Sequence, residues 1–106
     1  QIAARHLRAG RNTVEADFRA RIAAAGAPIL RVDDPRDSTT YLYTLLVPSD
    51  AHALFPSFDQ PDLKARVTTH ITAPASWTVV GNGPLEGRGP VRGGAQEWRF
   101  ATTPPI

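Results

Sequence analysis

The chain has 106 residues, which is enough for one small domain. Twelve Lys and Arg against ten Asp and Glu leave a net charge of +2, and the basic residues are scattered, so we expect no nucleic-acid partner. The absence of cysteine excludes disulfides and thiolate metal sites, and the apolar stretches are too short for a membrane span, so we expect no membrane partner.

Ten prolines and eight glycines are spread along the chain and favour short strands joined by turns. Hydrophobic residues make up 42% of the chain, which is typical of a folded domain. The chain begins at Gln1 without a methionine or a visible signal peptide. We therefore expect a cytoplasmic protein that is either processed or excised from a longer one.

Residues 13–22 alternate strictly between apolar and polar side chains, with Val14, Phe18 and Ile22 on the apolar side. A helix would distribute these apolar groups all round its surface, whereas a strand places them on one face. The pattern predicts a half-buried strand over residues 13–22.

The segments that follow predict a pair of strands and then a short helix. Residues 28–32 and 40–47 are rich in β-branched, aromatic and aliphatic side chains and predict strands. Residues 33–38 between them predict a turn with Asx-type hydrogen bonds, because Asp residues flank Pro35. Residues 49–54 predict one helical turn with Ser49 as its N-cap.

The second half of the chain begins with a proline-rich loop over residues 55–63, which we expect to pack against the domain because it carries two Phe and a Leu. Strands are predicted over residues 64–72, 77–80 and 96–101, the last with Trp98 and Phe100 on one face. Between them, Gly81-Asn82-Gly83 is typical of a hairpin turn, and residues 87–94 form a glycine-rich, charged tip.

Six or seven strands at roughly ten-residue spacing predict an all-β fold. We expect an antiparallel β-sandwich or saddle-like sheet with one short helical turn. No repeat or linker divides the chain, so residues 1–106 are predicted to form a single domain.

No group of residues has the spacing of an active site. His6, His52 and His70 lack metal-ligand spacing and are interpreted as surface or hydrogen-bonded structural histidines. Asp33, Asp34 and Asp37 crowd one turn without the spacing of a calcium loop, and Asp59 and Asp62 are paired carboxylates by sequence proximity alone. No G-x-S-x-G motif frames a nucleophile, and no helix follows the glycines to bind phosphate. We therefore expect no catalytic residue, metal or cofactor in this segment.

Trp77 and Trp98 allow two readings. They could form a stacking platform for a sugar or a base, but we favour packing in the core, because tryptophan dominates the cores of small β domains.

Several runs together resemble the N-terminal domain of aminopeptidase N-type zinc peptidases. The most specific is residues 55–65, Phe-Pro-Ser-Phe-Asp-Gln-Pro-Asp-Leu-Lys-Ala. Others in register are residues 7–12 (Leu-Arg-Ala-Gly-Arg-Asn), 41–44 (Tyr-Leu-Tyr-Thr), 48–52 (Pro-Ser-Asp-Ala-His), 73–83 and 98–106. The resemblance therefore covers nearly the whole chain.

The resemblance implies that the chain is a structural and substrate-gating piece of a larger enzyme. Such an enzyme removes N-terminal residues from peptides with a zinc-bound water, and its H-E-x-x-H and Gly-x-Met-Glu-Asn motifs lie beyond this chain. The implied partners are the catalytic domain of the same parent chain and a peptide substrate. Zinc is implied for the parent, and this segment alone is not expected to be an enzyme. Ser57 stands where the family usually has Cys, and Asp59 and Lys64 are interpreted as holding their loop against the sheet.

Leu45 and Val47 depart from the family pattern. They match a Gln-x-Glu pair whose acidic member helps to hold the α-ammonium group of the substrate, and neither can accept a hydrogen bond from it. Either the parent anchors the ammonium with its other domain alone, or its substrate preference is altered, or it is a weakened enzyme. Our hypothesis is that Leu45 and Val47 line the first substrate subsite as an apolar wall.

The alternative function is that of a free-standing β-sandwich module, which would bind a carbohydrate or protein partner through Trp77, Trp98 and the tip at residues 84–94. The two readings differ in a simple respect. A domain of a larger enzyme should carry apolar surface that the rest of the enzyme covers, whereas a free-standing module should expose its tryptophans.

Overall fold

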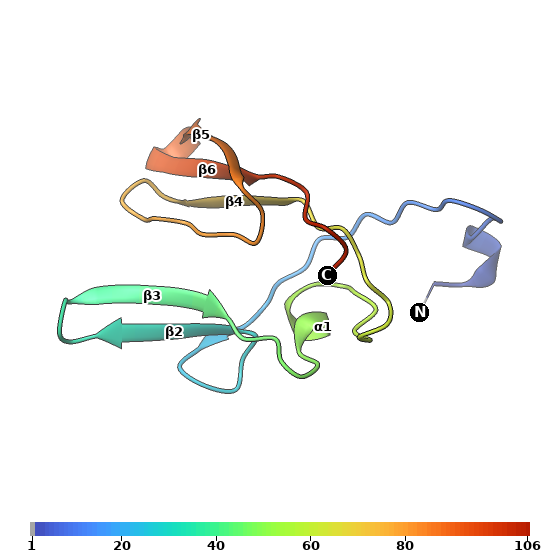
Figure 1. The fold of residues 1–106 in the computed structure, drawn as a ribbon, viewed down its shortest axis with the longest axis horizontal. Coiled ribbons are helices and arrows are strands. Elements are labelled where there is room, and N and C mark those ends of the chain that lie inside the picture. The colour runs from blue at the N-terminus through green and yellow to red at the C-terminus, as the bar shows by residue number, and fades with distance from the viewer. Residues whose placement is uncertain (1) are drawn as a thin grey trace. The chain divides into compact units, whose positions relative to one another are not determined.

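The computed structural model describes residues 2–106, which contain six strands, one short α-helix and two 3₁₀ turns (Figure 1). In chain order the elements are η1 (Ala4–His6), β1 (Ile22–Ala23), β2 (Ile29–Asp34), β3 (Thr39–Thr44), α1 (Ala51–Leu54), β4 (Thr69–Pro74), β5 (Leu85–Val91), η2 (Arg92–Gly94) and β6 (Ala95–Phe100). The prediction of an all-β chain with six or seven strands and one short helical turn is confirmed.

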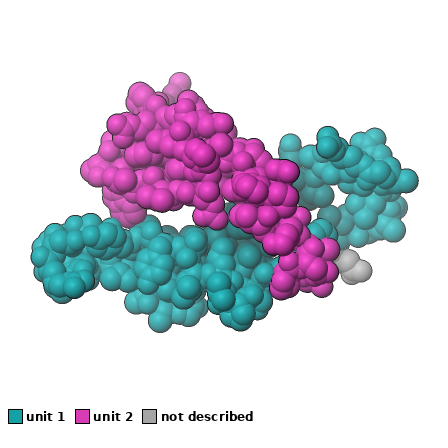
Figure 2. Space-filling model, viewed as in Figure 1, with its two compact units in different colours: residues 1–59 teal, residues 60–106 magenta. Residues whose placement is uncertain are grey.

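The chain divides into two compact units, one ending at Asp59 and the other starting at Gln60 (Figure 2). Each unit contains one three-stranded sheet. No helix within residues 2–106 has the length and apolar character that crossing a bilayer demands.

The first sheet has the order β1-β2-β3. β1 runs parallel to β2, and β2 runs antiparallel to β3 with Leu30 opposite Tyr43. The turn between β2 and β3 is held by two aspartates, since Asp34 accepts a hydrogen bond from the Arg36 amide and Asp37 from the Thr39 amide, both at 2.9 Å. These are the Asx-type bonds that the sequence predicts at this turn.

The second sheet has the order β4-β6-β5, and both of its strand pairs are antiparallel. The β5–β6 hairpin turns at η2, where Gly93 and Gly94 have φ values of 80° and 73° that side chains other than glycine's rarely adopt. The predicted glycine-rich tip at residues 87–94 is therefore shorter in the structure, because its first half belongs to β5.

The core is small, and the two large apolar side chains that are buried both lie in the second unit. Trp98 and Phe100 are each 4% exposed and alternate with the exposed Arg99 along β6. Thr103, 3% exposed, extends the same region beyond the strand. Its amide donates to the Val67 carbonyl at 3.0 Å, and its Oγ1 accepts from the Val67 amide at 3.1 Å. The prediction that Trp98 packs in a core is confirmed.

The strand prediction over residues 13–22 is wrong for this structure. The only strand there is β1, which begins at Ile22, and residues 13–21 are not part of any sheet. The alternation identifies a chain with two unlike faces, but a strand also needs a hydrogen-bonded neighbour, and residues 2–106 supply none to this segment.

Four other local predictions are also wrong. Residues 77–80 form no strand, so Gly81-Asn82-Gly83 is not a hairpin turn. Residues 64–68 likewise lie outside β4. The N-cap of α1 is Asp50, and no side chain at that position caps the helix. Instead, the Asp59 carboxylate accepts a hydrogen bond from the His52 amide at 3.1 Å, so Asp59 caps the helix in place of the predicted Ser49.

Candidate functional site

Leu45 and Val47 lie directly after β3, where the chain leaves the first sheet. The Leu45 amide donates to the Pro28 carbonyl at 3.3 Å, which extends the β2–β3 ladder by one more pair. The Leu45 side chain is 53% exposed and that of Val47 is 79% exposed. Both apolar side chains are therefore accessible for contact with another molecule or domain.

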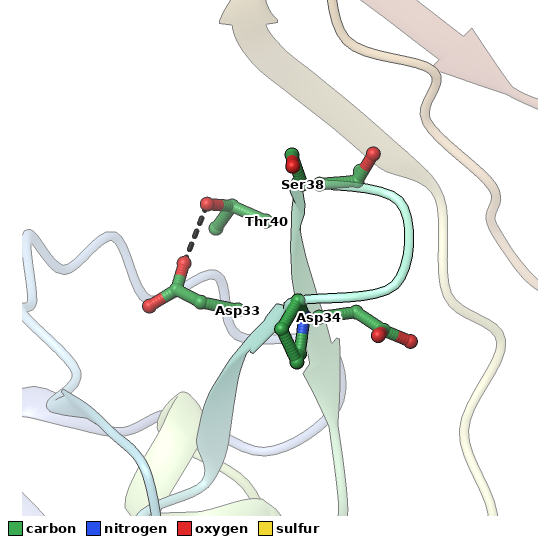
Figure 3. Close-up of a pocket in the computed structure, with 6 residues that line it drawn as sticks. Asp33, Asp34, Ser38 and Thr40 are labelled. Carbon is green, nitrogen blue, oxygen red and sulfur yellow. Dashed lines mark hydrogen bonds between the residues drawn. The ribbon is translucent and has the colours of Figure 1, made fainter.

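A shallow pocket lies at the other end of the same hairpin, around the turn between β2 and β3 (Figure 3). Asp33 accepts hydrogen bonds from the Arg31 guanidinium and, at 2.6 Å, from the Thr40 hydroxyl. The bond from Arg31 is the main reason that the pKa of Asp33 lies below its ordinary value. Asp34 likewise has a lowered pKa because it pairs with Arg36 at 2.6 Å.

Asp37 completes this group of carboxylates. It accepts a hydrogen bond from the Tyr41 hydroxyl at 2.6 Å, which lowers the pKa of Asp37 and raises that of Tyr41. Each of the three carboxylates is thus committed to a neighbouring side chain as an anion. These bonds join the two ends of the β2–β3 turn, so the arrangement stabilises the turn.

His52 and Asp59 form a second polar contact in the first unit. The Nδ1 atom of His52 lies 2.8 Å from Asp59 Oδ2, the same oxygen that accepts the His52 amide. This contact raises the pKa of His52 and lowers the pKa of Asp59. The contact holds Asp59 to the start of α1. Asp59 is therefore structural, as predicted, but it holds its loop to the helix and not to the sheet. No motif in the sequence signals this contact, because His52 and Asp59 are seven residues apart and on different local elements.

The two tryptophans have different surroundings. Trp98 is buried, and the Arg88 guanidinium lies 5.2 Å from the centre of its ring. This cation–π contact was not apparent from the sequence, because Arg88 and Trp98 become neighbours only through the β5–β6 register. Trp77 is half-buried. The two rings therefore do not both present an open face for stacking a ligand.

The described residues also lack a metal-binding arrangement. Within residues 2–106, no three His, Cys, Asp or Glu side chains come together in a group that could hold a metal ion. His6 and His70 are exposed and lie on separate elements.

Comparison with known proteins identifies the family of the chain. Residues 2–106 match the family described as the Peptidase M1 N-terminal domain. The chain belongs to this family. This M1 N-terminal domain is also 37% identical over 107 residues to Aminopeptidase N of Streptomyces lividans, an alignment that covers 100% of this chain. The chain covers only 12% of the length of that relative.

Family membership confirms the resemblance inferred from the sequence. The match is to the N-terminal domain of these peptidases and covers a small part of the relative's length. The side chains of residues 2–106 do not fit a zinc site.

Proposed function

We propose that this chain is the N-terminal structural and substrate-gating domain of a zinc-dependent aminopeptidase that removes N-terminal residues from peptides. Its partners would be the catalytic domain of the same polypeptide, which would hold the zinc, and the peptide substrate. The domain itself would line the entrance to the active site with apolar side chains and would contribute no catalytic group.

The observation that carries this proposal is how few large apolar side chains are buried. Seventeen are exposed in the described residues, and only Trp98 and Phe100 are buried. A domain that folds alone normally buries most of its large apolar side chains, and a covering partner is one reason why a domain does not. A chain that spans 12% of its relative leaves most of a polypeptide to act as that partner.

Leu45 and Val47 would form the part of the domain that meets the substrate. Their exposure at the end of β3 supports this role, because side chains at this position are free to face another domain. An apolar wall favours an apolar first side chain in the substrate and offers no acceptor to its α-ammonium group.

The test is to restore acceptors in the longer enzyme with the double variant Leu45→Gln/Val47→Glu. A hydrogen bond to a charged group contributes about 1.5–3 kcal/mol, so we expect KM for a simple aminoacyl amide to fall by about tenfold or more. Leu42→Gln is the matched control, since Leu42 is 38% exposed on β3 itself and should leave KM unchanged. An unchanged KM in the double variant, at normal zinc content, would contradict the gating role.

A further inference from the structure

Gly81-Asn82-Gly83 forms neither a strand nor the hairpin turn that its sequence predicts, and its backbone lies against the end of β6. A Cβ atom added at Gly81 would lie 2.9 Å from Cγ of Phe100, and one added at Gly83 would overlap the Ala101 carbonyl oxygen. Asn82, between the two glycines, is exposed. The segment therefore combines a closely packed backbone with a polar side chain in solvent.

The chain contains two asparagines, and their side-chain amides have different surroundings. The Oδ1 atom of Asn12 accepts a hydrogen bond from the Arg8 amide at 3.0 Å, and its Nδ2 atom donates to the carbonyls of Arg8 and Gly10 at 2.8 and 3.1 Å. Within residues 2–106, no hydrogen bond of this kind holds the Asn82 side chain or the amide of Gly83. The Asn82 side chain is thus the less restrained of the two.

We propose that Asn82 is a site of spontaneous deamidation and that the isoaspartate formed there loosens the end of β6. The backbone nitrogen of Gly83 loses its proton to solvent and bonds to Cγ of Asn82. The Cγ–Nδ2 bond breaks, and Nδ2 takes up a proton and leaves as ammonia. Water then opens the resulting cyclic imide at one of its two carbonyl carbons, so the reaction needs water and no other co-reactant.

The residue that follows each asparagine also favours reaction at Asn82. Gly83 has no side chain, so nothing attached to its Cα atom hinders the approach of its nitrogen to Cγ. Asn12 is followed by Thr13, whose branched Cβ crowds the corresponding nitrogen. An unrestrained amide and an unhindered nitrogen therefore occur together at Asn82 and not at Asn12.

The structure places the consequence of this reaction at the end of β6. When water opens the imide at the main-chain carbonyl carbon, the product is isoaspartate, and the Cβ methylene of residue 82 becomes part of the backbone. The extra atom enters directly before Gly83, which already packs against Ala101. The Ala101 amide donates to the Pro84 carbonyl at 2.9 Å. Because a closely packed region does not accept an added methylene without movement, we expect this hydrogen bond to open more often.

The first experiment incubates the native gene product at neutral pH and follows peptides that contain Asn82 or Asn12 by mass spectrometry. Incubation continues until a synthetic peptide of residues 79–86 is converted. We expect the Asn82 peptide to gain the mass difference between aspartate and asparagine, and the Asn12 peptide to stay unchanged. A protease that cleaves before aspartate but not before isoaspartate distinguishes the two products. Asn82→Gln is the matched control, because its longer side chain closes the larger ring slowly, and it should stay unmodified.

The second experiment is hydrogen–deuterium exchange in peptides that contain Ala101. We expect exchange there to be about fivefold faster or more in the incubated protein than in fresh protein, as loss of one hydrogen bond predicts. Asn82→Asp carries the charge of the product on a backbone of normal length. It should therefore exchange like the fresh protein.

Intact Asn82 in the protein, after the synthetic peptide has been converted, would overturn the proposal, and so would equal conversion of Asn12. Unchanged exchange at Ala101 after conversion would overturn the predicted loosening of β6, as would equally fast exchange in Asn82→Asp. None of these measurements depends on peptidase activity, so this inference stands or fails separately from the proposed function.

Discussion

The close approach of Gly83 to the chain after β6 gives a sharp prediction about stability. A Cβ atom added at Gly83 would lie 2.2 Å from the Ala101 carbonyl oxygen. A carbon and an oxygen that are not bonded normally stay more than 3 Å apart, so the backbone would have to move by about 1 Å. The movement would strain the adjacent hydrogen bond from the Ala101 amide to the Pro84 carbonyl, which is 2.9 Å long.

The expected cost of Gly83→Ala follows from these two effects. Overpacking costs about 1–3 kcal/mol, and a lost backbone hydrogen bond costs about 1 kcal/mol, which together give about 2–4 kcal/mol. Gly89→Ala is the matched control, since a Cβ there meets nothing within 4 Å. Because glycine in a strand interior is itself unfavourable, Gly89→Ala should be neutral or stabilising by about 0.5–1 kcal/mol.

The assay is thermal or urea unfolding followed by tryptophan fluorescence, to which the buried Trp98 contributes. For a domain of this size, about 4–8 °C of Tm corresponds to 1 kcal/mol, so Gly83→Ala should unfold at least about 8 °C below Gly89→Ala. Equal unfolding midpoints for the two variants would refute the reasoning.

Two further predictions concern polar contacts. Thr103→Val should destabilise the second unit by about 1–3 kcal/mol, because it leaves the Val67 amide without its side-chain acceptor, whereas Thr103→Ser should cost less than about 1 kcal/mol. Equal urea midpoints for these two variants would show that the bond contributes nothing. The His52–Asp59 contact should be strongest between the ordinary pKa values of the two groups, 3.8 for Asp59 and 6.5 for His52. The raised pKa of His52 means that its contribution is lost as the pH rises through that pKa, and the lowered pKa of Asp59 means that its contribution is lost as the pH falls through that pKa. Amide exchange in α1, corrected for intrinsic rates, should therefore be faster at pH 8.5 than at pH 5.5, and Asp59→Asn should remove the difference; a variant that kept it would contradict the assignment.

The sequence predicted best the strands whose partners are neighbours in the chain. β2 and β3 are joined by a four-residue turn, and the aspartates whose side chains stabilise this turn are themselves its sequence signal. β6 was predicted from the alternation of Trp98 and Phe100, which the structure buries on one side. In these elements the local pattern and the pairing partner lie within one short stretch of sequence.

The failures share one physical cause. Residues 13–21 and 77–80 both have strand-like patterns, but neither segment pairs with a neighbouring strand in the described residues. A side-chain pattern reports which face is apolar and says nothing about whether a neighbour exists. The same limit applies to the site. Leu45 and Val47 were identified by resemblance, since no local pattern in the sequence marks a contact with a substrate.

The outer edge of β3 has a consequence for anyone who produces this chain in isolation. In the described residues β3 pairs with β2 alone, and residues 40–47 (Thr-Tyr-Leu-Tyr-Thr-Leu-Leu-Val) contain no charge and no proline. Uncharged, β-prone segments on an unprotected edge are nuclei for cross-β aggregation, and natural proteins guard them with lysine or proline gatekeepers. We therefore expect aggregation through this edge to lower the yield of soluble protein. Tyr43→Lys, at an exposed position on β3, should raise that yield.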